Sequence, residues 1–115
     1  MEAILNKSKK CLIVRLQGEL DDHAAAKMRQ TLKDLLKKYH DFSLLLNLQD
    51  LHFIDSSGVG VILGRYREMS QGEREILLCC LNSQVRRVLE LAGVLKIIPC
   101  FDSEKEALNQ GRFVQ

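Results

Sequence analysis

Strand-like and helix-like segments alternate along this 115-residue chain, and the alternation constrains its fold more than any single motif. Apolar runs at 11–16, 42–48 and 75–81 are typical of buried strands. Apolar residues recur at helical spacing over 22–39 and 56–69, in the gaps between those strands. Strands that alternate with helices favour a mostly parallel sheet with right-handed crossovers.

The first segments predict a hairpin at the edge of this sheet. Residues 3–5 and 11–16 flank a polar turn, Lys7-Ser8-Lys9-Lys10. Leu12, Val14 and Leu16 alternate as one buried face of a strand does. We therefore expect an antiparallel N-terminal edge strand next to the parallel strands.

Two helices are predicted in the first two thirds of the chain. The helix over 22–39 has Asp21 or Asp22 available as its N-cap. The helix over 56–69 ends at Gly72 or before a turn containing it. We expect its inner face to carry Val59, Leu63 and Tyr66.

Two further helices and a short strand are predicted near the C-terminus. Asn82 or Ser83 caps a helix that ends at Gly93. Its buried side chains are expected to be Val85, Val88, Leu89 and Ala92. Residues 95–98 predict a last strand before Pro99. Ser103 and Glu106 form a capping box for a terminal helix.

The predicted fold class is therefore α/β. We expect one domain over 1–115, with a mostly parallel sheet of four to five strands and about four helices. A hydrophobic content of 46% is enough for a packed core, and no linker or repeat divides the chain.

Composition argues against several classes of partner. The 17 basic and 15 acidic residues give a formal charge of +2, and the chain has no basic stripe rich in aromatic residues, so nucleic acid is not expected as a partner. No apolar run approaches the roughly 20 residues of a membrane helix. With no apolar leader before Lys7, we expect a soluble, cytoplasmic protein without a membrane partner.

The four cysteines are expected to be reduced and to have a packing role. Cys11, Cys79, Cys80 and Cys100 lack paired C-x-x-C spacing. Cys79 and Cys80 are neighbours on a predicted strand, so their side chains should point to opposite faces and not converge on one metal. The sequence predicts neither a metal site nor a cofactor.

The start of the helix at 56 is the candidate functional site. Asp55 is placed to be the N-cap, which puts Ser56 at the first helical position, facing outward. The unpaired N–H groups and positive dipole at a helix start stabilise a phosphate there. Ser56 or Ser57 is therefore a candidate phosphorylation switch, although both serines are also common capping residues.

Three glycines follow the serine pair in this helix. Gly58, Gly60 and Gly64 each cost roughly 0.5–1 kcal/mol relative to alanine in a helix interior. Their number indicates that something approaches the helix backbone closely. Either the sheet below or a partner above fits that requirement.

The main alternative is a small serine hydrolase or nucleotide-binding protein that uses the Asp55-Ser56-Ser57-Gly58 turn. A P-loop needs a lysine followed by Ser or Thr, and no such pair follows Gly64. The G-x-S-x-G elbow of hydrolases is absent. His52 precedes the turn with no evident orienting group, and His23 and His40 are interpreted as ordinary surface or core histidines. We expect no catalytic residue and no enzyme activity.

Three stretches carry a family resemblance over nearly the whole chain. Gly18-Glu19-Leu20-Asp21, Asn47-Leu48 and the run from Phe53 to Gly60 together resemble the STAS domain of anti-sigma factor antagonists. The runs 61–66 and 92–98 are similar to the sporulation members of that family.

The resemblance implies a regulatory cycle. In such proteins the dephosphorylated form binds an anti-sigma factor that is also a serine kinase, and so releases a sporulation sigma factor. The kinase then phosphorylates its antagonist at the serine after the aspartate, which is Ser56 here, and a phosphoserine phosphatase reverses the step. The implied partner surface comprises Asp21, Asp55, Ser56, Ser57, Gly58 and Gly60. STAS modules also occur in stress-response switches and transporter tails.

Overall fold

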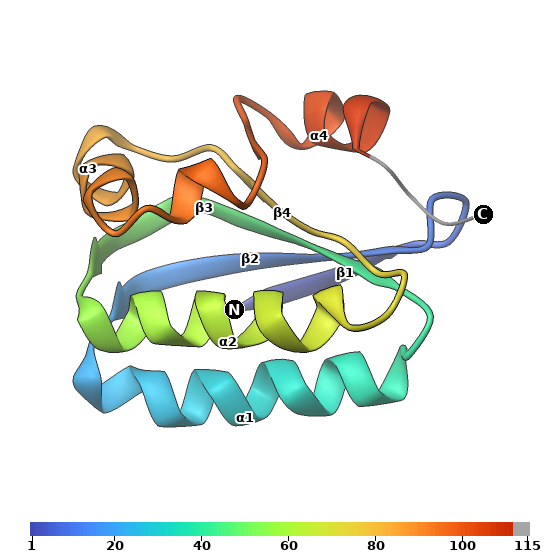
Figure 1. Cartoon of the computed structure of the whole chain (residues 1–115), viewed down its shortest axis with the longest axis horizontal. Coiled ribbons are helices and arrows are strands. Elements are labelled where there is room, and N and C mark those ends of the chain that lie inside the picture. Colours follow the sequence, from blue (N-terminus) through green and yellow to red (C-terminus); the bar gives the residue numbers. More distant parts are fainter. Residues whose placement is uncertain (112–115) are drawn as a thin grey trace.

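A five-stranded sheet in the order β1-β2-β3-β4-β5 forms the centre of the structure (Figure 1). The computed structural model describes residues 1–111. The strands are β1 (Glu2–Asn6), β2 (Cys11–Leu20), β3 (Ser43–Ile54), β4 (Ile76–Cys79) and β5 (Cys100–Phe101). Strand β1 pairs with β2 antiparallel, and the other pairings in this sheet are parallel. The expected α/β class with an antiparallel N-terminal edge strand is confirmed.

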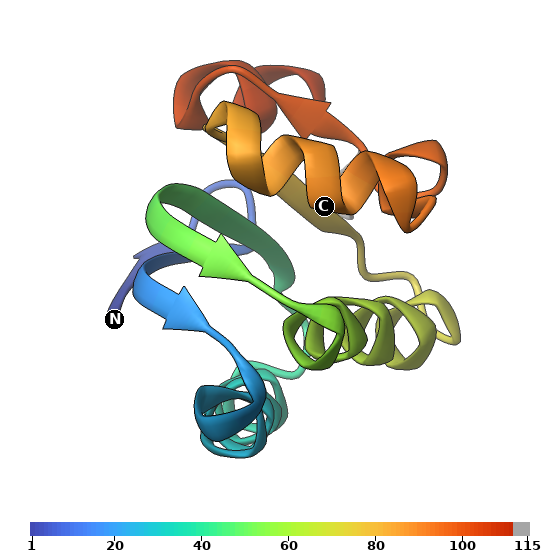
Figure 2. The ribbon, with the colours of Figure 1, turned by 90° about the vertical axis from the view of Figure 1, so that its left-hand side faces the viewer.

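Helices lie on both faces of this sheet. They are α1 (Asp22–Lys38), α2 (Ser56–Ser70), α3 (Ser83–Leu91) and α4 (Glu104–Gln110), with a short 3-10 helix at Val94–Lys96. Helices α1 and α2 lie side by side on one face, whereas α4 lies on the other (Figures 1 and 2). None of the helices within residues 1–111 is long and apolar enough to cross a membrane.

The covering of both faces explains why the strands are apolar at successive positions. Side chains of a strand point alternately to its two faces. Leu12 and Val14 of β2 belong to the larger core cluster, which includes residues of α1, α2 and α3. Cys11 and Ile13 belong to a smaller cluster closed by Ala107 of α4. The strand face predicted from Leu12, Val14 and Leu16 is thus confirmed.

Each of the helices α1 to α4 begins at a side-chain cap. Asp21 accepts from the Ala24 N–H at 3.0 Å, and Asn82 accepts from the Val85 N–H at 2.9 Å. Ser103 accepts from the Glu106 N–H at 3.0 Å, as one half of the predicted capping box does. Asp55 caps α2.

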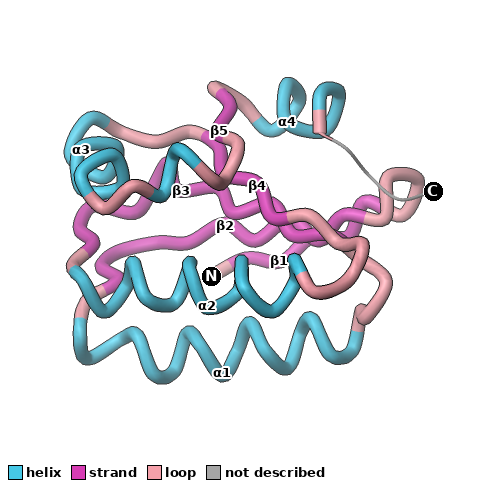
Figure 3. Tube along the Cα trace, viewed as in Figure 1, coloured by secondary structure: helices cyan, strands magenta, loops and turns pink. Residues whose placement is uncertain are grey.

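The strand predicted at 95–98 is wrong. Gly93, with φ +78°, ends the helical segment, and the N–H groups of Ile97 and Ile98 bond back to the Val94 carbonyl. The apolar run therefore closes a 3-10 turn, and the strand β5 follows Pro99 (Figure 3). A short apolar run does not distinguish strand from helix by periodicity, which explains the error.

The predicted inner face of α2 is confirmed by Val59, Leu63 and Tyr66, which lie in or against the core, but it is too narrow, and one residue predicted to be buried in α3 is exposed. In α2 the fully buried side chains include Val61, Ile62 and Met69, whereas Leu63 and Tyr66 are half-buried at the edge of the core. Helix α2 packs against α1 as well as the sheet, which broadens its buried face. Ala92, expected to be buried in α3, is the exposed C-cap residue of that helix.

Strand β3 is longer than the predicted segment 42–48. It continues to Ile54 beside β2, where the register shifts around Gln17 and Gly18. Gly18 has φ +81°, a backbone conformation that favours glycine. This extension carries the chain directly to Asp55 and the start of α2.

Candidate functional site

The Asp55-Ser56-Ser57-Gly58 turn lies at the carboxyl ends of two neighbouring strands, β2 and β3. Leu20 at the end of β2 pairs with Ile54 at the end of β3. Because these strands are parallel, the helices that follow them begin next to each other, at the left of Figure 1. The amino ends of α1 and α2 therefore form one surface.

Asp55 holds these two helix starts together. One carboxylate oxygen, Oδ1, accepts from the N–H groups of Ser57 at 2.9 Å and Gly58 at 3.2 Å. The other, Oδ2, accepts from the Asp22 N–H at 3.2 Å. Asp55 is thus confirmed as the N-cap of α2, and it also contacts α1.

The two serines differ in their surroundings. Ser57 is half-buried, and its hydroxyl donates to Asp22 Oδ1 at 3.1 Å. Ser56 is exposed at the first position of α2, as the capping argument predicts. An incoming group from solvent can approach Ser56 more freely than Ser57.

The glycines of α2 serve different purposes. Gly58 is buried, and a methyl group added there would clash with the carbonyl oxygen and side chain of Leu20. Gly60 is exposed, and a Cβ at Gly60 or Gly64 would meet open space. The close approach to this helix is therefore made at Gly58 by the ends of β2 and β3, through Leu20 and Ile54, whereas Gly60 lies on the open surface.

At the junction of β2 and α1, Asp22 contributes to this surface more directly than Asp21 does. Asp21 is half-buried and caps α1, whereas Asp22 is exposed and is bonded to both Asp55 and Ser57. Asp21 therefore lies next to the implied partner surface, but its neighbour Asp22 makes the hydrogen bonds to the start of α2.

Two exposed residues at this edge were not among the predicted site residues. His52 and Phe53 lie near the end of β3, and Phe53 is 39% exposed. An exposed phenylalanine two residues before the cap gives the surface an apolar component. The signal was missed because the predicted strand ended at residue 48, which left the orientation of Phe53 undefined.

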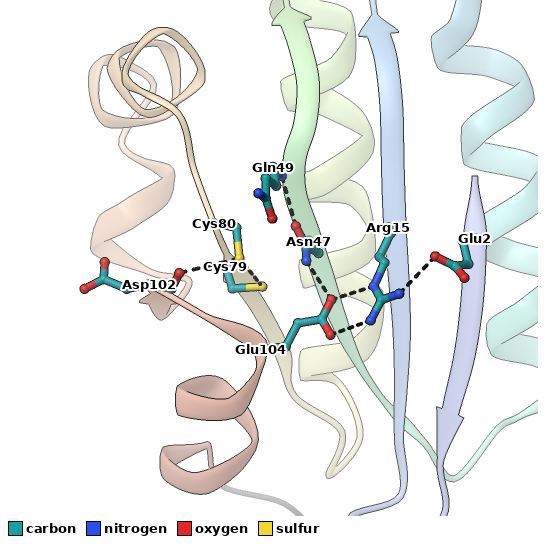
Figure 4. A network of polar contacts seen from close by, with 8 residues as sticks. All are labelled: Glu2, Arg15, Asn47, Gln49, Cys79, Cys80, Asp102 and Glu104. Carbon is teal, nitrogen blue, oxygen red and sulfur yellow. Dashed lines mark hydrogen bonds and ion pairs between the residues drawn. The ribbon is translucent and has the colours of Figure 1, made fainter.

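A polar network occupies the opposite face of the sheet, under α4 (Figure 4). Glu104 accepts from the guanidinium of Arg15 at 2.8 Å through each oxygen and from Asn47 Nδ2 at 2.6 Å. Arg15 also donates to Glu2 at 3.0 Å. The Arg15 hydrogen bonds lower the pKa of Glu104 more than burial raises it. This network lines a cavity of about 440 Å³.

Cys79 and Cys80 do not point to opposite faces, contrary to the prediction. Cys79 ends β4, whereas Cys80 lies beyond the strand with φ +62°. This left-handed turn brings the two sulfurs to 3.5 Å. Within residues 1–111, no cluster of three or more His, Cys, Asp or Glu side chains is arranged to hold a metal ion.

A comparison with protein families identifies the fold. The model of the STAS domain matches residues 2–107. The chain belongs to the STAS domain family. An anti-sigma F factor antagonist of Paenibacillus polymyxa is 41% identical over 99 residues, which cover 86% of this chain and 85% of that protein.

Solved structures of SpoIIAA have the same fold. The anti-sigma factor antagonist SpoIIAA in its unphosphorylated form is 26% identical, with a TM-score of 0.72 and 98% of each chain covered. The Bacillus cell fate determinant SpoIIAA in the phosphorylated form is 28% identical, with a TM-score of 0.70, and the match covers 96% of this chain and 100% of that one. These relatives support a regulatory role as an anti-sigma factor antagonist.

Proposed function

We propose that the unphosphorylated chain binds an anti-sigma factor that is also a serine kinase, and thereby releases a sporulation sigma factor. Phosphorylation of Ser56 ends this binding, and a phosphoserine phosphatase restores it. The surface involved comprises Asp21, Asp55, Ser56, Ser57 and Gly60, supported from below by Gly58.

The observation that carries the proposal is the exposed Ser56 hydroxyl beside an engaged Ser57. Ser56 stands at the first position of a 15-residue helix, where N–H groups and the helix dipole favour an anion. Ser57 already donates to Asp22. A kinase that selects by access would therefore modify Ser56.

Relatives support a phosphorylation switch in a protein of this fold. The Paenibacillus relative is an anti-sigma F factor antagonist, and SpoIIAA has been solved both without and with phosphorylation. A protein of this fold thus accepts a phosphoryl group. The name of the Paenibacillus relative favours the sigma F branch for this chain.

Local electrostatics explain how one phosphate could switch binding. Phosphoserine adds roughly −1.5 to −2 charge at pH 7. The start of α2 attracts this charge, whereas the carboxylates of Asp55 and Asp22 repel it. These effects oppose each other within the chain. We therefore expect phosphorylation to change the affinity for the partner more than the structure of the chain. A dianion facing a surface complementary to a hydroxyl costs several kcal/mol.

The hydrolase alternative receives no support from the hydrogen bonds of this turn. Within the part of the chain that the structure describes, the side chain of Asp55 accepts from backbone N–H groups and that of Ser57 donates to Asp22, and neither bonds to a histidine. A serine nucleophile needs a base within hydrogen-bond reach. The binding role is therefore the one we propose.

Phosphate mapping tests the assignment. The full chain would be incubated with a sigma-F-type anti-sigma factor and ATP, and the modified residue identified by mass spectrometry. We expect one phosphate, on Ser56, and none in Ser56→Ala. Ser57→Ala is the matched control, because it removes the neighbouring hydroxyl and should still be phosphorylated.

Measurements of binding distinguish a variant that can no longer be phosphorylated from one that can no longer bind the kinase. Ser56→Ala should still bind the kinase, because the exposed hydroxyl is small. Phosphate on Ser56→Ala, or on Ser57 of the unaltered chain, would refute the assignment of Ser56. Loss of binding in Ser56→Ala with its fold intact would show that the hydroxyl itself is a contact.

A further inference from the structure

Two adjacent thiols meet at the end of β4. Cys79 Sγ and Cys80 Sγ are 3.5 Å apart, and Figure 4 shows the sulfurs close to each other. They do so because Cys80 takes a left-handed backbone conformation, with φ +62°, which L-residues other than asparagine and aspartate rarely adopt. In an extended strand the same two side chains would lie on opposite faces.

The two thiols differ in access. Cys79 is fully buried in the smaller core cluster, and this burial raises the pKa of its thiol strongly. Cys80 is partly exposed and lines both the 440 Å³ cavity beneath α4 and a second cavity of about 320 Å³. A small oxidant in solvent therefore reaches Cys80 first.

We propose that Cys79 and Cys80 form a site of reversible oxidation, at which a peroxide converts the two thiols to a disulfide between adjacent residues. Cys80 attacks hydrogen peroxide, so that the O–O bond breaks and Cys80 becomes a sulfenic acid with release of one water. Cys79 then displaces the hydroxyl from Cys80, which forms the S–S bond and releases a second water. The sulfurs lose two electrons and the peroxide gains them.

This disulfide should be easily reduced. Neighbouring Cα atoms are about 3.8 Å apart across a trans peptide, which is shorter than the usual span of about 4.4–6.8 Å for a disulfide. A strained disulfide has a more oxidising potential and exchanges readily with a dithiol. The oxidised form would therefore be transient and reversible.

The structure also indicates which segment would sense the change. The Cys80 thiol lies 3.5 Å from the carbonyl oxygen of Asp102, to which it donates. Asp102 directly precedes Ser103, which caps α4. The next residue, Glu104, binds Arg15. A disulfide removes the S–H donor, so oxidation should loosen the attachment of α4.

Thiol counting tests the proposal. The folded, full chain would be treated with hydrogen peroxide, unfolded and alkylated. We expect a loss of two of the four alkylatable thiols and of two hydrogens from the peptide that contains both cysteines, with full recovery after a dithiol reductant. Amide exchange in 104–110 should accelerate by about two- to five-fold, as the loss of one weak hydrogen bond predicts.

Single substitutions provide the controls. In Cys79→Ala, peroxide should leave a sulfenic or sulfinic acid on Cys80 and no disulfide. Cys11→Ala is matched to it, because Cys11 is equally buried in the same cluster and should leave the disulfide yield unchanged. Phenylarsine oxide, which bridges two nearby thiols, should protect the pair from alkylation in the unaltered chain, which keeps the proposal testable if either variant folds poorly.

Three results would overturn the proposal. The first is over-oxidation of Cys80 in the unaltered chain while Cys79 stays reduced. The second is a disulfide that joins Cys80 to Cys100 or to a second chain. The third is a failure of phenylarsine oxide to protect the pair in the folded protein.

Discussion

At the scale of single residues, Gly58 lies on the packed side of α2, whereas Gly60 lies on its exposed side. A side chain at Gly58 would collide with Leu20, whereas one at Gly60 would enter open space. We expect Gly58→Ala to lower the free energy of unfolding by about 1–3 kcal/mol through overpacking. Gly60→Ala should be neutral or stabilising by up to about 1 kcal/mol, because alanine favours helix. Urea unfolding of both variants measures this difference.

Gly60 also tests where a partner approaches. We expect Gly60→Leu to keep the fold, since nothing lies within 4 Å of the added Cβ, and to place a bulky side chain on the exposed side of α2. We expect the affinity for the anti-sigma factor to fall by at least about ten-fold, which corresponds to about 1.4 kcal/mol. Unchanged affinity in calorimetry, with the unfolding curve preserved, would remove Gly60 from the partner surface.

A carboxylate at Ser56 should reproduce the phosphate only in part. Aspartate carries a single charge and two acceptor oxygens, whereas phosphoserine carries nearly two charges and three acceptor oxygens. We expect Ser56→Asp to weaken partner binding less than phosphorylation does, as titration calorimetry would measure. If Ser56→Asp bound like the unmodified chain, charge at the interface would not explain the switch.

At the scale of elements, Glu104 fixes α4 to the sheet. The bonds from Arg15 lower the pKa of Glu104 below its ordinary value of 4.5. A lowered pKa in the folded state stabilises the fold above the unfolded pKa, and this stabilisation is lost as the pH falls through the folded value. Acidification below about pH 4.5 should therefore remove the stabilisation that this pair gives to the attachment of α4.

Glu104→Gln tests the contribution of the ion pair. We expect it to lower the free energy of unfolding near pH 7 by about 1 kcal/mol and to reduce the loss of stability on acidification. Glu106→Gln is the matched control, because Glu106 lies in the same helical turn. Equal pH profiles for the unaltered chain and Glu104→Gln would contradict this role.

The sequence predicts elements that have strong periodicity or a side-chain cap. Asp21, Asp55, Asn82 and Ser103 all cap the helices expected of them. The strand prediction for 95–98 was wrong because this apolar run is too short to define a period. The contact of Cys79 with Cys80 depends on one left-handed residue, and the Arg15–Glu104 pair joins positions 89 residues apart. Neither has a local sequence signal.

At the scale of the whole molecule, phosphorylation should change the surface and not the fold. The formal charge of +2 falls close to zero with one phosphate. The α2 dipole and the nearby carboxylates act on that phosphate in opposite directions. We expect the far-ultraviolet circular dichroism spectra of the two forms to coincide, with chemical-shift changes confined to the starts of α1 and α2. Shift changes throughout the sheet would contradict a local switch.

The most direct test of the central claim is the affinity of one preparation for the anti-sigma factor before and after stoichiometric phosphorylation of Ser56. The account predicts a fall of at least about 100-fold, because a buried, unmatched dianion costs several kcal/mol. Treatment with a phosphoserine phosphatase should restore the original value. Equal affinity of the two forms would contradict the phosphorylation switch.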